Sequence, residues 1–107
     1  MERCVRDGRV AVLVSPNFGA GWFSWHGIEA LLFDPAVVGL VESGAEASVI
    51  EQYCEDRYGS DPYTAPYFGG AGDLIVQWVP VGARFRIHEY DGSESLVFES
   101  EEQWIVA

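Results

Sequence analysis

The chain has 107 residues, enough for one domain, and sets 17 acidic residues against six arginines and no lysine, for a net charge of −11 at pH 7. Such a charge repels nucleic acid and anionic membranes and attracts basic protein surfaces. Hydrophobic residues make up 49% of the chain, which excludes a disordered polymer and suffices for one core. The longest apolar stretch, residues 10–14, is too short to span a bilayer, and the charged N-terminus is unlike a secretory signal. We therefore expect one cytoplasmic domain, residues 1–107, that binds neither nucleic acid nor membrane.

The first third of the chain predicts one strand and a loop. Residues 9–15 are β-branched and apolar on both faces, which favours a strand in the middle of a sheet, covered on both sides. A glycine-aromatic loop follows at residues 16–25. Residues 28–33 fit a short helix or a strand equally well.

Two helices are predicted next. Asp34 and Pro35 indicate a helix start, because the carboxylate can accept hydrogen bonds from first-turn amides and proline fits the first helical position. This helix ends at residues 43–44. A second helix is expected over residues 45–58, with an apolar stripe at helical spacing and Gly59 as its C-terminal stop.

The chain then returns to extended structure. Residues 59–73 are rich in glycine, proline and aromatic residues and predict a loop. Residues 74–79 alternate with a period of two, and Pro80 ends that strand. A last strand is expected at residues 103–106.

The clearest local signal is a hairpin over residues 84–99, built on Asp91 and Gly92 in a type I′ turn. A two-residue turn sets the register, so the expected cross-strand pairs are Phe85 with Phe98, Ile87 with Leu96, His88 with Ser95, and Arg84 with Glu99. The apolar pairs share one face, as a packed sheet requires. All the elements together predict an α+β fold: one antiparallel sheet of four to five strands, with a two-helix insertion between the first and the later strands.

No catalytic motif accompanies this fold. The sequence contains neither a Walker pattern nor a Gly-x-Ser-x-Gly motif, and its histidines and cysteines lack metal-ligand spacing, so no cofactor and no metal are expected. Cys4 and Cys54 are interpreted as reduced thiols, with Cys54 buried on a helix.

Two interpretations of the glycine-aromatic loops, residues 16–25 and 63–72, are open. Their rings can wall a pocket for a planar, nucleotide-like ligand, or they can cap one end of the core while the glycines turn the chain. The same choice applies to the basic side chains of the hairpin, which can hold a phosphate or carboxylate or can pair with neighbouring acids. The candidate ligand-binding residues are Phe18, Trp22, Trp25, Tyr67, Phe68, Arg84 and Arg86.

The acidic residues supply a second candidate site. Along exposed faces, carboxylates can imitate a phosphate backbone and occupy a nucleic-acid-binding groove of another protein; the alternative is a solvated surface that keeps the chain soluble. Glu89 and Glu94 should oppose each other in the hairpin, where like charges either fray outward or hold a cation between them. The candidate partner-binding residues are Glu42, Glu46, Glu51, Glu55, Asp56, Glu89, Asp91 and Glu94.

Five sequence blocks resemble a family of small acidic proteins carried by bacteriophages and mobile elements. The blocks span residues 7–16, 18–22, 32–35, 78–80 and 85–92. The family has no established activity, so no functional residue is carried over. The resemblance implies a bacterial cytosolic setting and a role against host defence, as in inhibitors of CRISPR effectors.

These observations favour a non-enzymatic interaction protein, a phage-encoded inhibitor whose acidic surface binds a basic, nucleic-acid-binding host protein. The alternative is a protein that sequesters a nucleotide-like ligand between the two loops. The sequence leaves the oligomeric state open, a dimer included.

Overall fold

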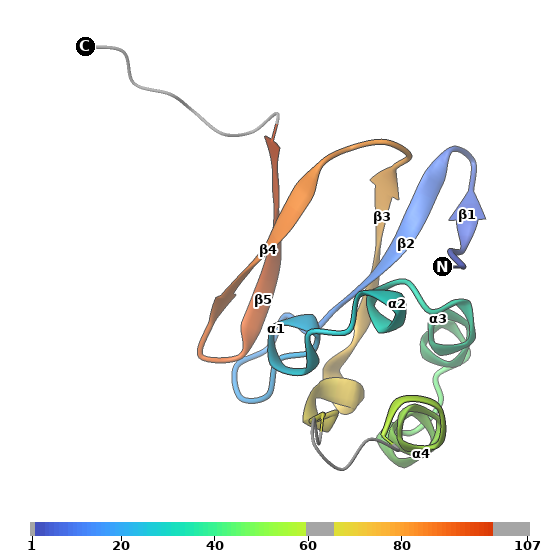
Figure 1. The fold of residues 1–107 in the computed structure, drawn as a ribbon, viewed down its shortest axis with the longest axis vertical. Helices are drawn as coiled ribbons and strands as arrows, with labels where there is room; N and C mark the ends of the chain where they lie inside the picture. Colours follow the sequence, from blue (N-terminus) through green and yellow to red (C-terminus); the bar gives the residue numbers. More distant parts are fainter. Residues whose placement is uncertain (1, 60–65, 100–107) are drawn as a thin grey trace.

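The computed structural model describes residues 2–59 and 66–99, and its first sheet has three antiparallel strands (Figure 1). β1 (Val5–Arg6) and β3 (Ile75–Pro80) flank β2 (Arg9–Val14). β1 and β2 are joined by Asp7 and Gly8, whose φ angles of 51° and 75° fit a two-residue hairpin turn. β1 was not predicted, although its turn carries the same Asp-Gly signal as the later hairpin.

The second sheet is that later hairpin, β4 (Phe85–Tyr90) and β5 (Ser93–Phe98). Asp91 and Gly92 have φ angles of 48° and 86°, which confirms the expected turn. The predicted register is confirmed at each pair, from Phe85 with Phe98 to His88 with Ser95. Just before the hairpin, Arg84 pairs with Glu99 at 3.3 Å, also as predicted.

The α+β class is confirmed, but the single sheet that we expected is wrong, because the five strands of the described residues form one sheet of three and one of two. β2 already has a partner on each edge, so no edge of this central strand remains for the hairpin. Pro80 ends β3, and Gly82 follows with a φ of 84°. The chain turns there, and the hairpin packs its apolar face over the first sheet instead of extending it.

Helices fill the connection between β2 and β3 (Figure 1). The two predicted helices are confirmed as α3 (Pro35–Glu42) and α4 (Ala47–Tyr58). Asp34 caps α3, accepting hydrogen bonds from the backbone N–H of Ala36 and of Val37. The remaining helical elements are α1 (Phe23–His26), α2 (Glu29–Leu32) within the undecided segment, and the 3-10 helix η1 (Gly69–Asp73) within the predicted loop.

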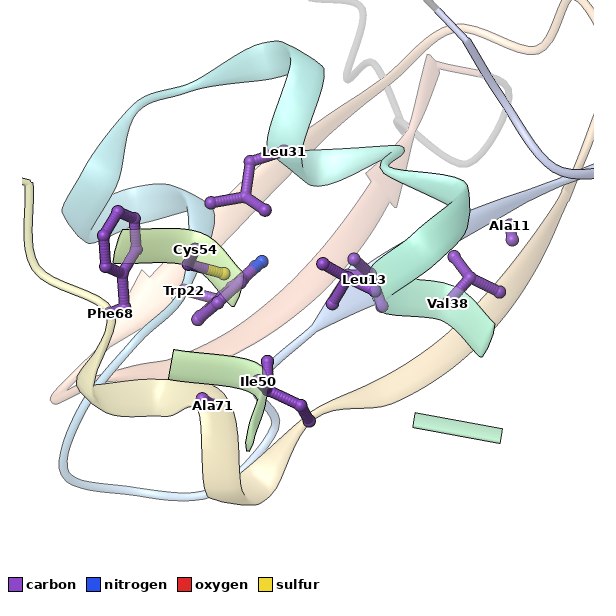
Figure 2. Packing of buried hydrophobic residues seen from close by; sticks show 10 residues of the cluster. Ala11, Leu13, Trp22, Leu31, Val38, Ile50, Cys54, Phe68 and Ala71 are labelled. Carbon is purple, nitrogen blue, oxygen red and sulfur yellow. The ribbon is translucent and has the colours of Figure 1, made fainter. Parts of the chain in front are cut away.

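β2 lies at the centre of the core, as its two apolar faces predicted. Leu13 and Ala11 point to the helices and belong to the cluster that includes Trp22, Ile50 and Cys54 (Figure 2). The other face meets the hairpin through three valines, Val10, Val12 and Val14.

Both cysteines are free, and Cys54 is buried on α4 as expected. No helix in residues 2–59 and 66–99 is long and apolar enough to cross a bilayer. The strand expected at residues 103–106 lies outside the described residues.

Candidate functional site

The expected acidic face is centred on α4. Glu46 lies at the N-terminal cap of that helix, and Glu51 and Glu55 follow on it, one turn apart. Asp56 accepts a hydrogen bond from the Gln52 side-chain amide at 2.9 Å. Of these four acids, Glu46, Glu55 and Asp56 are exposed and Glu51 is half-buried. The helix therefore presents carboxylates along its solvent side.

Glu42 belongs to a different environment. Its two carboxylate oxygens accept hydrogen bonds from the Arg6 guanidinium at 2.8 and 2.9 Å, which is a bidentate ion pair. The pair ties α3 to β1, and Arg6 also lies over the Trp78 ring, 5.2 Å from its centroid. The charge of Glu42 is thus compensated within the fold.

The acids of the hairpin lie away from α4, on the other side of the view in Figure 1. Glu89 and Glu94 oppose each other as predicted. Glu94, however, is only 2% exposed, and its carboxylate accepts hydrogen bonds from Ser15 N at 3.1 Å, Ser24 N at 2.8 Å and Ser24 Oγ at 2.5 Å. The expected outward fraying is therefore wrong for Glu94, because three protein donors take the place of water around it. Asp91, in the turn, is exposed.

The two glycine-aromatic loops meet, and two of their five candidate rings are in the core. Trp22 is fully buried and Phe68 is 4% exposed, with ring centroids 6.2 Å apart (Figure 2). Gly70 lies so close to Gly21 that a Cβ there would collide with the Gly21 carbonyl oxygen. At these positions the described parts of the loops close the end of the core.

The loop junction also half-buries His26. Its Nδ1 accepts a hydrogen bond from Ile28 N at 2.8 Å, so the neutral ring carries its proton on Nε2. The His26 ring packs against Trp22 at 5.0 Å, and within the described residues the Nε atoms of both rings are buried without a hydrogen-bond partner. Burial lowers the pKa of His26 to about 4, so this ring is neutral at pH 7.

A second buried polar cluster surrounds Asp34. Besides capping α3, its carboxylate accepts hydrogen bonds from the hydroxyls of Tyr58 at 2.6 Å and Tyr53 at 2.9 Å. Burial and the hydrogen bond to Asp34 raise the pKa of Tyr53 to about 12, and burial raises that of Cys54 to about 12. Tyr53 and Cys54 are therefore protonated at pH 7, and the hydrogen bonds to Asp34 join α3 to α4. No group of three or more potential metal ligands is found in the part of the chain described.

Two of the three remaining loop aromatics contact each other, and one of them lies beside α4. Trp25 and Tyr67 are 45% and 52% exposed, and their tilted rings have centroids 5.3 Å apart. Tyr67 forms one wall of a groove of about 460 Å³ whose other wall is the acidic side of α4. The groove is lined by Ser48, Glu51, Gln52, Glu55, Pro66, Tyr67, Phe68 and Gly69.

This groove combines two sets of residues that the sequence analysis treated as alternative sites. Glu51 and Glu55 come from the predicted acidic face, and Tyr67 comes from the predicted ligand-binding loop. A carboxylate pair facing an exposed aromatic ring suits a guanidinium or ammonium group, which takes charge-assisted hydrogen bonds from one wall and a cation–π contact from the other. No sequence spacing links Glu51 to Tyr67, so no signal was available to predict the juxtaposition.

The other exposed candidates are placed separately. Phe18 is 71% exposed and packs edge-on against Tyr90 at the tip of the hairpin. Arg84, paired with Glu99, and Arg86 lie on β4 or next to it, beside a different cleft.

No protein-family model matches this chain, and neither a curated protein nor a solved structure is significantly similar to it, so a functional assignment rests on the chemistry of the chain's own sites.

Proposed function

We propose that this protein acts by binding, and that the acidic side of α4 engages a basic surface of a partner protein. The observation that carries the proposal is the groove in which Glu51 and Glu55 face Tyr67. Arginine is the side chain that fits it best, because a planar guanidinium stacks on aromatic rings and pairs with carboxylates in a fixed geometry.

The rest of the molecule's charge supports this function. With a net charge of −11, long-range attraction accelerates encounter with a cationic surface, and Glu46 and Asp56 extend the negative field along α4. Cationic surfaces of that kind are typical of proteins that bind nucleic acid. Together with the resemblance to small acidic phage proteins, this favours an inhibitor that occupies the nucleic-acid site of a host defence protein.

The test uses a hexa-arginine peptide as the probe and its hexa-citrulline counterpart, which has the same shape without the charge. We expect the double variant Glu51→Gln/Glu55→Gln to lose about tenfold in affinity for the arginine peptide in calorimetric titration. The matched control, Glu46→Gln/Asp56→Asn, removes the same charge outside the groove and should lose less than about threefold.

The aromatic wall is tested separately. Tyr67→Phe keeps the ring and should bind as the parent does, whereas Tyr67→Leu should weaken binding by several fold. Equal losses in the two acidic double variants would show that charge acts without the groove and would overturn the proposal. So would a thermal shift with free nucleotides that disappears in the Tyr67→Leu variant, because that result would favour the ligand-sequestering alternative.

A further inference from the structure

The outer edge of β4 is the feature that the proposed function leaves unused. In an antiparallel hairpin, alternate residues direct their backbone N–H and C=O toward the partner strand. A two-residue turn makes Tyr90 and Ser93 such a bonded pair, and Glu99 N donates to Arg84 O at 3.0 Å at the other end. The backbone groups of Phe85, Ile87 and Glu89 therefore point away from β5. In the described sheets β4 pairs with β5 alone.

A cleft of about 550 Å³ lies along this edge. Five consecutive residues from Ala83 to Ile87 line it. Because side chains alternate between the two faces of a strand, consecutive lining residues indicate that the cleft borders the edge of the strand and not one of its faces. Phe23, Leu32 and Phe33 supply an apolar floor from the helical side. A cleft of this size accommodates a few residues of extended chain.

Positive charge collects around the same cleft, in a protein that is otherwise anionic. Arg3, Arg84 and Arg86 all line it, and they are half of the chain's six arginines; Glu29 lines it too, and Arg84 pairs with Glu99. The Arg3 guanidinium lies 4.3 Å from the centroid of the Phe33 ring. No carboxylate in the described residues forms an ion pair with Arg3. The local charge favours an anionic occupant.

We propose that the outer edge of β4 binds an extended peptide segment of a partner protein, added as a further strand, whose side chains alternate between apolar and acidic. The backbone of Phe85, Ile87 and Glu89 provides hydrogen bonds that any sequence can accept. The alternation follows from the two faces of the strand. Phe85 and Ile87 pack on the core side, whereas Arg84 and Arg86 are exposed on the opposite side.

The experiment uses the whole protein with the peptide acetyl-Glu-Val-Glu-Val-Glu-Val-amide as the probe and its Glu-to-Lys counterpart as the control. Amide hydrogen exchange followed by NMR should show fast exchange at Phe85 and Ile87 in the free protein, beside protected amides at Arg86 and His88. Saturating Glu-Val peptide should slow exchange at Phe85 and Ile87 by about tenfold or more, and the Lys-Val peptide should not.

Backbone pairing is distinguished from simple charge attraction by N-methylated peptides. Only one edge of an added strand faces β4, so methylation of alternate peptide nitrogens in one phase should abolish binding, and methylation in the other phase should not. Equal losses in both phases, or in neither, would overturn the proposal. Protection that rises with protein concentration without peptide would also overturn it, because a second copy of the chain would then be the occupant.

Protein variants give an independent readout. Ile87→Pro removes one outward N–H while the N–H groups of Arg86 and His88 remain to pair with β5, and it should abolish peptide binding. Arg3→Gln should weaken binding several-fold, whereas Arg9→Gln, a matched loss of charge outside the cleft, should not. Unchanged binding in Arg3→Gln would contradict the role of the arginines. None of these variants touches the α4 groove, so the two proposals fail or succeed separately.

Discussion

Glu94 joins the hairpin to the first sheet and to α1 through its buried carboxylate. Its oxygens accept hydrogen bonds from Ser15 N and from both the N–H and the hydroxyl of Ser24. The Glu94 N–H also donates to Ser15 O at 2.7 Å, so backbone and side chain act on the same contact. Truncation of this side chain leaves the buried Ser15 N–H and the partly buried donors of Ser24 without an acceptor, which is the costly way to lose a hydrogen bond.

We expect Glu94→Ala to lower the free energy of unfolding by about 3 kcal/mol, and Glu94→Gln, which keeps one acceptor oxygen, by roughly half as much. Glu89→Gln, on the facing but exposed residue, should change it by less than about 0.5 kcal/mol. Urea denaturation of the three variants measures these differences. Equal stabilities of Glu94→Ala and the parent would contradict the buried position of Glu94.

His26 makes the stability depend on pH. Its pKa is lowered from 6.5 to about 4 by burial, so between these values the unfolded chain binds a proton that the folded protein does not. This contribution to stability is complete above pH 6.5 and is lost as the pH falls toward 4. The variant His26→Asn, whose side-chain oxygen can replace Nδ1 as acceptor for Ile28 N, should show a smaller loss from pH 7 to pH 5. Urea denaturation at both pH values tests this, and parallel losses in the two proteins would contradict it.

At the scale of elements, two Asp-Gly turns of the same type have different surroundings. Gly8 has a φ of 75° and open space where a Cβ would be, whereas a Cβ on Gly92, at a φ of 86°, would collide with the Gly19 carbonyl oxygen. The Gly19 N–H also donates to Asp91 O at 2.8 Å, which holds the loop and the turn together.

The two turns therefore allow a matched comparison. Gly8→Ala should cost about 1 kcal/mol, because only the left-handed backbone conformation opposes it. Gly92→Ala should cost about 3 kcal/mol, since it must also separate the hairpin from the loop. Urea denaturation of both variants measures the difference, and equal costs would show that the Gly19 contact contributes nothing.

At the scale of the whole molecule, charge sets which partners approach. We expect no mobility shift of duplex DNA or single-stranded RNA at micromolar protein and physiological salt, because the net charge of −11 opposes the phosphate backbone. The arginines beside β4 are too few to reverse this field. A mobility shift that disappears in the double variant Arg84→Gln/Arg86→Gln would contradict the expectation and identify the arginines as a nucleic-acid contact.

Elements whose signals are local could be predicted from the amino-acid sequence alone. Asp34 and Pro35 start a helix through their own chemistry, and Asp91 and Gly92 specify both a turn and the pairing of the strands beside it. The apolar residues on both faces of residues 9–15 likewise required a covered, central strand. Asp7 and Gly8 carried an equally local signal for β1, and it was overlooked.

How the surfaces combine depends on contacts between elements that are far apart in the sequence. That Glu94 is buried while Glu89 is exposed depends on Ser15 and Ser24, which are 79 and 70 residues away along the chain. The division into two sheets likewise depends on the turn after Pro80, which places the hairpin over the first sheet and not beside the outer edge of β3. Glu51 faces Tyr67 because α4 packs beside the segment that leads into η1. Such contacts join residues distant in sequence, and no spacing or propensity encodes them, because they exist only once the elements are packed.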